Sequence, residues 1–310
     1  MKAAAGLASF LTFAIAVLPA VAQDQLTPAA PVFKAASDLV VLHVNVFDGR
    51  SDAVPNLPQG AFRVTEDGEP QEITFFSNED VPVAVGLIVD NSGSMIARNP
   101  MVRAGAKAFA ASSHPEDEVF TIVFNEHVQH GLPDGIAFTR SHAQIEVAVS
   151  RFPPGGRTAL YDAVVAGLEH LQEASHQKRV LVVLSDGEDN ASMHSDDAML
   201  ERAARSDALI YTISTADLMS NDGNPGVLKK LARVSGGASY APDSEREVVD
   251  AFREIAENIR RGFSIGYVPT NHVRDGRFRR VKVSVRVSGN KDLKVIARDG
   301  YLAPRNPGVN

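Results

Sequence analysis

The chain of 310 residues contains no cysteine. It can therefore form no disulfide and offers no cysteine for a lipid anchor, so the fold must depend on its hydrophobic core. After residue 22 the sequence also has no apolar run long enough to cross a membrane. The formal net charge of -7 is mildly acidic, which gives no indication of a nucleic-acid partner.

Motifs of common enzyme classes are missing as well. The chain has no G-x-x-x-x-G-K-[ST] phosphate loop and no H-E-x-x-H zinc motif. The serines within residues 90–94 lack the flanking glycines of a G-x-S-x-G nucleophile elbow. These absences favour a protein that is not an enzyme.

The N-terminus has the pattern of a secretory signal. A single positive charge at Lys2 precedes an apolar stretch that ends in the small residues Ala20-Val21-Ala22. This pattern predicts a signal peptide over residues 1–22 and a secreted or periplasmic protein, with an uncleaved membrane anchor as the alternative. Residues 23–37 are rich in Ala, Pro and Gln and predict a disordered leader.

Both ends of the remaining chain have the patterns of β-strands. An Asp-Gly pair at residues 67–68 predicts a hairpin between two of them, 62–65 and 73–76. Neither end has enough strands to be stable alone, so we expect 38–80 to pair with 262–303 in a small all-β sandwich, followed by a tail over 304–310. The expected strands are residues 39–47, 62–65, 73–76, 263–268, 279–288 and 293–297.

Between these segments, over residues 81–261, apolar strand patterns alternate with helical ones. Such alternation is typical of an α/β fold in which helices flank a mostly parallel central sheet. We therefore predict a Rossmann-like α/β domain inserted in the β-sandwich. The expected strands are residues 83–89, 119–124, 180–184 and 209–213, and helices are expected from Pro100, over 143–152, from Thr158, and over 198–204, 227–234 and 245–261.

Oxygen-bearing side chains follow the first strand of this region. The apolar run 83–89 ends in Asp90, Ser92 and Ser94, which are spaced two apart in a short turn. Open α/β sheets bind ligands at the carboxyl ends of their strands, and hard oxygen donors suit a hard cation such as Mg2+. Helix capping is the alternative role for each serine taken singly.

At this point the sequence resembles a known family. The pattern Asp90-x-Ser92-x-Ser94, the later Thr158 in GGRTALYDA and Asp186 in VLVVLSDGEDN resemble the metal-ion-dependent adhesion site of von Willebrand factor type A domains. All five positions occur in the order of the family, and the resemblance covers roughly residues 81–261. With its signal peptide and flanking strands, the whole chain resembles the VWFA-related group of exported bacterial proteins.

The resemblance implies a divalent cation, Mg2+ or else Mn2+ or Ca2+. Hydroxyls of Ser92, Ser94 and Thr158 would bind it, with the carboxylates of Asp90 and Asp186 acting directly or through water. Two carboxylates only cancel the charge of the ion, so an Asp or Glu of a protein partner can still bind to it. The implied function is an exported adhesion or scaffolding module. The alternatives are a structural envelope-assembly protein whose metal only stabilises the fold, and a metal-assisted hydrolase, for which no general base is identifiable.

Three smaller expectations concern charged and capping residues. Thr158 is expected to cap the helix that begins there. Glu188 and Asp189, just after Asp186, are expected on a solvated loop. A basic run in the C-terminal segment favours a charged hairpin face, with binding of anionic surface polymers as the alternative. The run comprises Arg274, Arg277, Arg279, Arg280 and Lys282.

Overall fold

The structure is a computed structural model that describes residues 39–49, 53–216, 223–287 and 292–305. The expected signal peptide and leader lie outside these residues, as does the tail from residue 306. No helix among the described residues is both long and apolar enough to span a membrane.

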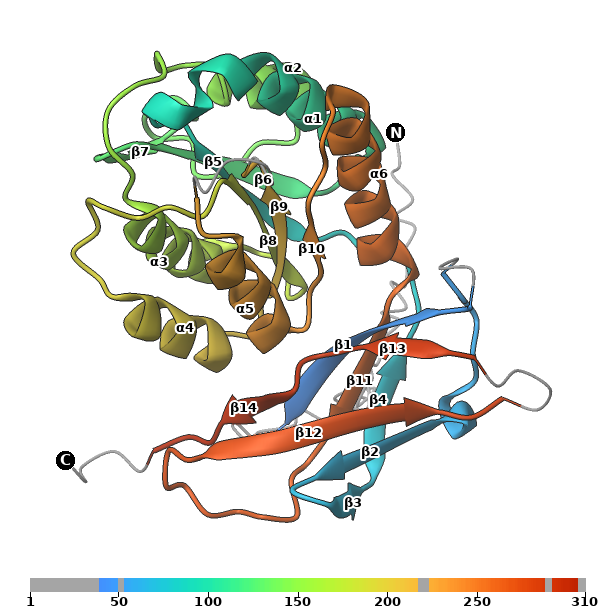
Figure 1. The fold of residues 1–310 in the computed structure, drawn as a ribbon. Coiled ribbons are helices and arrows are strands. Elements are labelled where there is room, and N and C mark those ends of the chain that lie inside the picture. Colours follow the sequence, from blue (N-terminus) through green and yellow to red (C-terminus); the bar gives the residue numbers. More distant parts are fainter. Residues whose placement is uncertain (1–38, 50–52, 217–222, 288–291, 306–310) are drawn as a thin grey trace, which may run out of the picture. The chain divides into compact units, whose positions relative to one another are not determined.

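A six-stranded sheet forms the centre of the α/β domain (Figure 1). Its strand order is β10-β9-β8-β5-β6-β7, and every neighbouring pair is parallel except β6 and β7. The central strand β5 is buried along its whole length, as its apolar run predicts. The strands are β5 (Ala84–Asp90), β6 (Glu118–Phe124), β7 (Val128–His130), β8 (Arg179–Ser185), β9 (Leu209–Ser214) and β10 (Ser239–Tyr240).

Helices cover both faces of this sheet (Figure 1). Val85 and Leu87 of β5 pack in one core with α1 and α6, whereas Ala84 and Ile88 pack in a second core with α3, α4 and α5. All six expected helices are present. They are α1 (Asn99–Ser112), α2 (His142–Ala148), α3 (Leu160–His170), α4 (Asp196–Arg205), α5 (Pro225–Ser235) and α6 (Glu245–Arg261), with short 3-10 turns η1 (Gln59–Ala61), η2 (Gly93–Arg98) and η3 (Leu171–Glu173).

The remaining strands form a β module of two four-stranded sheets, β13-β1-β11-β4 and β14-β12-β2-β3. All pairings within them are antiparallel, and strands from both ends of the chain share each sheet. Leu42, Phe62 and Phe263 lie in the core between the sheets. The α/β domain is thus inserted in a β-sandwich, as expected. The strands are β1 (Val40–Phe47), β2 (Phe62–Glu66), β3 (Glu69–Gln71), β4 (Ile73–Ser77), β11 (Phe263–Tyr267), β12 (Phe278–Val285), β13 (Lys294–Ile296) and β14 (Gly300–Leu302).

The predicted hairpin between residues 62–65 and 73–76 is wrong in its second strand. Asp67 and Gly68 do form a tight turn, both with positive φ, but the turn joins β2 to the short strand β3. The chain then passes to the other sheet, where β4 pairs with β11. Three residues of β3 are too few to show an alternating pattern, so the sequence did not reveal this strand.

Buried polar side chains join the β module to the α/β domain. The Arg298 guanidinium donates hydrogen bonds to the backbone carbonyls of Ala204 and Ser206, at the end of α4. On β1, the side-chain amide of Asn45 donates to the hydroxyl of Tyr211 in β9 over 3.3 Å. These contacts satisfy polar groups that would otherwise be buried unpaired.

Candidate metal centre

The carboxyl edge of the central sheet brings the expected site residues into one region. Strands β5 and β8 are parallel neighbours, and they end at Asp90 and Ser185. Asp186 therefore leaves the sheet beside Asp90, although the two are far apart in the chain. The turn η2 follows β5 directly and carries Ser94.

Three side-chain oxygens meet at this edge. The hydroxyls of Ser92 and Ser94 lie 3.2 Å apart. The Ser94 hydroxyl also donates a hydrogen bond of 2.6 Å to Oδ2 of Asp186. Two loops thus direct oxygen atoms of Ser92, Ser94 and Asp186 to the same place.

Asp90 lies deeper, with 1% of its surface exposed. Its Oδ1 accepts a hydrogen bond from the backbone N–H of Ser92 over 2.9 Å, and its Oδ2 accepts one from the Ser185 hydroxyl over 2.6 Å. Burial raises the pKa of Asp90 to about 6, and the neighbouring carboxylate of Asp186 adds to this rise, while the hydrogen bonds from Ser185 and Ser92 oppose it. The site therefore holds a negative charge that is poorly solvated.

The two carboxylates have no cationic partner within the described part of the chain. Asp186 is only 2% exposed, and no Lys, Arg or His forms a salt bridge with it or with Asp90 among those residues. Buried carboxylates are rare unless they are paired with a cation or bind a metal. Together with the serine hydroxyls, this donor set fits a small hard cation.

Imidazole, thiolate and carboxylate groups do not form a metal site by themselves in the described part of the chain. Within the described ranges no group of three or more His, Cys, Asp or Glu side chains lies close enough to hold a metal ion. A metal ion bound by Asp90, Asp186 and the hydroxyls would instead have neutral oxygens as most of its protein ligands.

The backbone of Thr158 forms hydrogen bonds with the loop that follows Asp186. Its N–H donates to the side-chain oxygen of Asn190, and its carbonyl accepts hydrogen bonds from the N–H groups of Asn190 and Ala191. The hydrogen bonds that the structure shows for Thr158 thus join its loop to the loop after Asp186. Contact between its hydroxyl and the other four side chains stays a prediction.

The expectation that Thr158 caps α3 is wrong. The helix begins at Leu160, and the residue in the capping position is Ala159, which has no side-chain acceptor. Instead, Oδ2 of Asp189 accepts a hydrogen bond from the N–H of Tyr161 over 2.9 Å. A side chain from another loop therefore satisfies the first turn of this helix.

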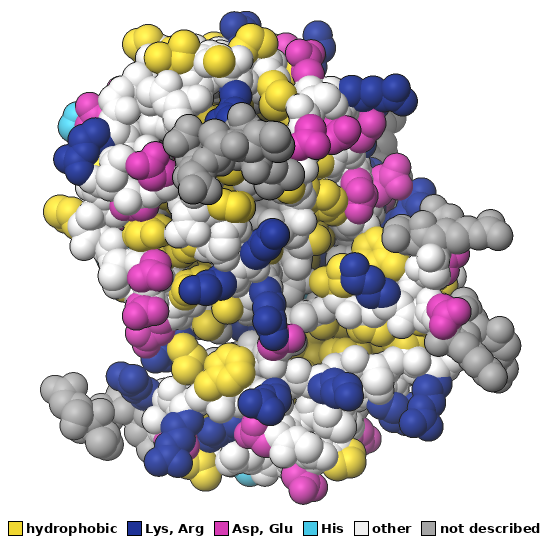
Figure 2. Space-filling view, in the orientation of Figure 1, with side chains coloured by type: hydrophobic (Ala, Val, Ile, Leu, Met, Phe, Trp, Pro, Cys, Tyr) yellow, Lys and Arg dark blue, Asp and Glu magenta, His cyan; other side chains and the backbone are white. Residues whose placement is uncertain are grey.

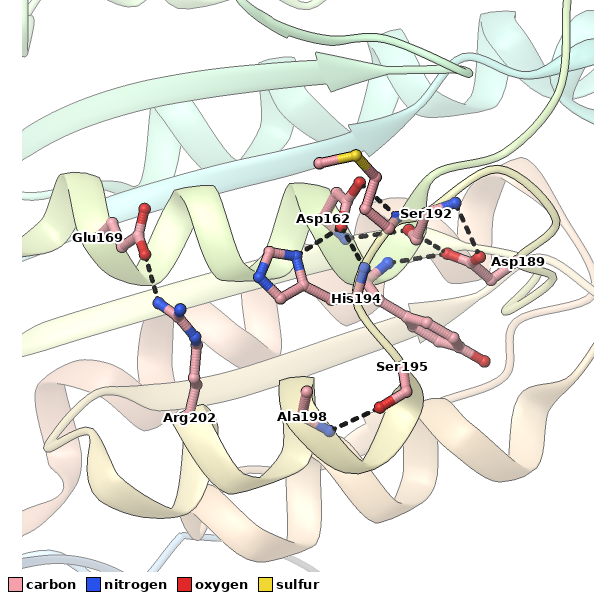
Figure 3. Close-up of polar contacts among 10 residues, drawn as sticks. Asp162, Glu169, Asp189, Ser192, His194, Ser195, Ala198 and Arg202 are labelled. Atoms are coloured by element: carbon pink, nitrogen blue, oxygen red, sulfur yellow. Dashed lines mark hydrogen bonds and ion pairs between the residues drawn. The ribbon is translucent and has the colours of Figure 1, made fainter. Parts of the chain in front are cut away.

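Asp189 and Ser192 form a capping pair rather than part of a solvated loop (Figure 3). The Ser192 hydroxyl donates to Oδ2 of Asp189 over 2.6 Å and accepts from the N–H of Asp162 over 3.0 Å. No local pattern signals this role, because the pair caps a helix that begins some 30 residues earlier. Glu188, in contrast, is exposed as expected.

Asp162 holds the same loop from the helix side (Figure 3). Its carboxylate accepts hydrogen bonds from the backbone N–H groups of Met193 and His194 and from Nδ1 of His194, the last over 2.7 Å. Partial burial favours a higher pKa for Asp162, but these hydrogen bonds outweigh it and leave the pKa below its usual value. The loop 189–194 is thus fastened to the N-terminus of α3, next to Thr158.

A third loop is fastened to the turn after β5. The N–H of Gly155 donates to the carbonyl of Asn91 over 2.8 Å, and the N–H of Gly93 donates to the carbonyl of Gly156 over 3.1 Å. Gly156 has a φ of 83° and its Cα approaches the carboxylate of Glu126, so a side chain here would be strained and would collide. Protein hydrogen bonds therefore connect all three loops of the candidate site.

Residues 85–188 match the family model described as von Willebrand factor type A domain. The chain contains a von Willebrand factor type A (VWA) domain. All five expected site residues lie within the matched range. The domain extends beyond it, since β9, β10 and α6 complete the sheet and its helical cover.

Several solved structures are similar to the chain at low sequence identity. The structure titled von Willebrand factor type A from Catenulispora acidiphila is 15% identical with a TM-score of 0.52, and the match covers 89% of this chain and 76% of that one. BatB from Bacteroides thetaiotaomicron is 17% identical with a TM-score of 0.47, over 57% of this chain and 98% of its own. The vWF domain of the type V pili tip protein Mfa5 from Porphyromonas gingivalis is 14% identical with a TM-score of 0.49, over 58% and 95%. A search of curated proteins gave no match.

Proposed function

We propose that the VWA domain binds a divalent cation, Mg2+ or else Mn2+ or Ca2+, and through it an acidic side chain of a protein partner. Asp90, Ser92, Ser94, Thr158 and Asp186 are the proposed metal-binding residues. In this proposal the protein is an exported adhesion or scaffolding module. The observation that carries the proposal is the pair of buried carboxylates, Asp90 and Asp186, without a cation beside them.

The charge of the site explains why an acidic partner is suitable. Two carboxylates neutralise a divalent ion, and the serine hydroxyls add no charge, so an incoming carboxylate is not repelled. A cation held here would offer an electrophilic position to that carboxylate. The five proposed residues would hold and orient the ion, and buried Asp90 also fixes the serine turn through the N–H of Ser92.

The connected loops favour a binding role over a purely structural one. The N–H of Thr158 donates to the side chain of Asn190, and the N–H of Gly155 donates to the carbonyl of Asn91, so hydrogen bonds hold the loops together. Because these hydrogen bonds join the loops, a bound cation has less of the loop assembly to supply, which supports a binding role. In the alternative, a structural envelope protein, the cation would mainly raise the melting temperature.

Calorimetric titration with Mg2+ and with Mn2+ tests the metal site. The protein is the metal-stripped chain without its expected signal peptide, compared with Asp186→Ala and with Asp197→Ala, which removes an exposed carboxylate on α4. We expect one saturable site in the wild type and in Asp197→Ala, and none in Asp186→Ala. Equal binding by all three proteins would refute the assignment.

Water-proton relaxation of the Mn2+-loaded protein tests the acceptance of a carboxylate. Acetate that binds the ion displaces a metal-bound water, so relaxation should fall as acetate is added, whereas acetamide should leave it unchanged. If acetate has no effect but EDTA lowers the melting temperature by many degrees, the cation has the structural role instead.

A further inference from the structure

A second surface of this acidic protein is strongly basic. A groove of about 600 Å3 lies between α5 and the outer face of β12 and β14. It is a pocket of the size that binds small ligands or short segments, which is roughly 300–1,000 Å3. The side chains that give it its character are Lys230, Arg233, Phe278, Arg280, Lys282 and Asp299.

The geometry of both elements directs the cations to the groove. Lys230 and Arg233 are three residues apart on α5 and therefore share a face of the helix. Arg280 and Lys282 alternate along β12 with the buried Arg279 and Val281, so both point outward. Figure 2 shows Lys and Arg side chains gathered over α5 and over β12 on this side of the molecule.

Most of this charge is not neutralised. Asp299 is the single carboxylate in the lining, and it forms a 2.6 Å ion pair with Arg233. Lys230, Arg280 and Lys282 are exposed, and none of them forms a salt bridge within the described ranges. Four cations against one carboxylate attract an anion to a protein whose overall charge would repel it.

The groove uses only part of the basic run that the sequence shows. Arg279 is 5% exposed and donates to the Asp275 carboxylate and the Val273 carbonyl, so it belongs to the structure of the β module. Arg277 lies 3.7 Å from the same carboxylate of Asp275. Arg277 and Arg279 therefore belong to the charged hairpin face that the sequence predicts. Arg280 and Lys282 instead line the groove.

An aromatic ring beside the free cations favours a polypeptide as the ligand. Phe278 is 49% exposed, yet its ring lies directly on the backbone of Gly300, where a side chain would collide with it. The ring is thus held in place and available for an apolar contact. Aromatic side chains and arginine are the types enriched in protein–protein interfaces.

The form of the helix argues against a phosphate group as the main ligand. Phosphate sites are built on the free N–H groups of helix N-termini or of backbone nests. Lys230 lies in the middle of α5 and Arg233 in its last turn, so this helix presents side chains to the groove and not its N-terminal N–H groups. The groove thus offers side-chain cations spread over two elements, which can pair with carboxylates spaced along an extended peptide.

We propose that the groove between α5 and β12–β14 binds an acidic segment of a protein, whose Asp or Glu carboxylates pair with Lys230, Arg280 and Lys282 while an apolar side chain contacts Phe278. This binding needs no metal and is independent of the VWA metal centre.

Fluorescence anisotropy with a labelled peptide of sequence EELEEL tests the proposal. The full chain without its expected signal peptide is used in EDTA, which removes any contribution from the metal centre. Lys230→Glu with Lys282→Glu should weaken binding at least tenfold. The matched control, Lys229→Glu with Lys107→Glu, has the same change in net charge at exposed positions outside the groove, one of them adjacent on α5, and should change binding less than twofold.

Further comparisons decide the class of ligand. Phe278→Ala should weaken EELEEL at least threefold, and QQLQQL should not bind. Equal losses in both charge variants would overturn the proposal, because they would show a nonspecific charge effect. Alginate and inorganic phosphate are also tested as competitors of the labelled peptide. If either displaces it at a lower concentration of carboxylate or phosphate groups than unlabelled EELEEL requires, the proposal is overturned in favour of a polysaccharide or phosphate site. Circular dichroism checks that each variant is folded. A Lys→Glu variant that does not fold is replaced by the corresponding Lys→Gln variant.

Discussion

The hydroxyl of Ser94 donates a 2.6 Å hydrogen bond to Oδ2 of Asp186, although 92 positions separate the two residues in the chain. The contact exists because β5 and β8 are parallel neighbours whose carboxyl ends lie at the same edge of the sheet. Functional side chains work best when the scaffold holds them close to their working positions. The effect of removing this contact can be measured separately for metal binding and for stability.

Ser94→Ala should reduce Mg2+ or Mn2+ affinity at least tenfold while the protein stays folded. The Ser94 hydroxyl donates to the buried Asp186 carboxylate, and loss of such a hydrogen bond should cost about 1–3 kcal/mol of folding free energy. Calorimetry gives the affinity and thermal unfolding the stability. Ser113→Ala is the control, since it removes one hydroxyl bonded to a helix carbonyl away from the site. An unchanged affinity in Ser94→Ala would show that this hydroxyl does not bind the ion.

Asn190→Ala should weaken metal binding although Asn190 is not a proposed ligand. Its side chain accepts from the N–H of Thr158, and partners of this kind that orient ligands typically contribute about 10- to 100-fold in metal affinity. Titration with Mn2+ measures the change. Asn271→Ala removes an Asn side chain that also accepts a backbone N–H, but in the β module, and should leave the affinity unchanged. Equal affinities in both variants would mean that Thr158 is positioned without Asn190.

Gly105→Ala should destabilise the α/β domain by about 1–3 kcal/mol. A methyl group at Gly105 would lie 2.4 Å from the Phe252 ring and 2.9 Å from Val248, so α1 and α6 would have to move apart. The better helix propensity of alanine, worth about 1 kcal/mol, offsets part of this cost. Urea unfolding measures the difference. Gly60→Ala, where no atom lies within 4 Å of the added carbon, is the matched control.

His43 should make the protein less stable in mild acid. Burial, together with the positive charges of Lys178 and Arg298, lowers the pKa of His43 from 6.5 to about 3. Below pH 6.5 the unfolded chain therefore binds a proton that the folded chain does not, so the free energy of unfolding falls as the pH drops from 6.5 towards 3. Above pH 6.5 this residue contributes no pH dependence.

Urea unfolding at pH 7, 6 and 5 measures this effect. The wild type should lose up to about 2 kcal/mol through His43 between pH 6.5 and pH 5, because each pH unit contributes at most about 1.4 kcal/mol. His43→Gln should lose correspondingly less over the same interval. His272→Gln, at an exposed position, should follow the wild type. Parallel curves for His43→Gln and the wild type would contradict the prediction.

The parts of the fold that the sequence predicts are those with long repeating patterns. The buried run of β5 and the apolar stripe of α6 extend over enough residues to identify the strand and the helix. The sequence also predicts that the strands at the two ends pair, because neither set can form a stable sheet alone. It places Asp90 and Asp186 together because each follows a predicted parallel strand.

The parts that sequence reasoning missed depend on contacts between distant residues. Strands β3, β7, β10 and β14 have two or three residues each, and their strand conformation comes from the neighbour with which they pair. Asp189 is recognisable as a capping residue only when α3 is seen beside it. For the same reason the groove residues Lys230 and Lys282, which come from separate elements, could not be grouped in advance.

The arrangement of the β module also determines when the chain can finish folding. Strand β1 lies between β11 and β13, and its contact from His43 to Ser264 spans 221 positions. When a growing chain has completed the six-stranded sheet at Tyr240, β1 still has neither of its neighbours. Contacts over such separations form slowly, and unpaired strands can associate with the wrong partner. A chain truncated after α6 would leave β1 and β4 in this exposed condition permanently, so the last 50 or so residues decide whether the first strands become part of a stable structure.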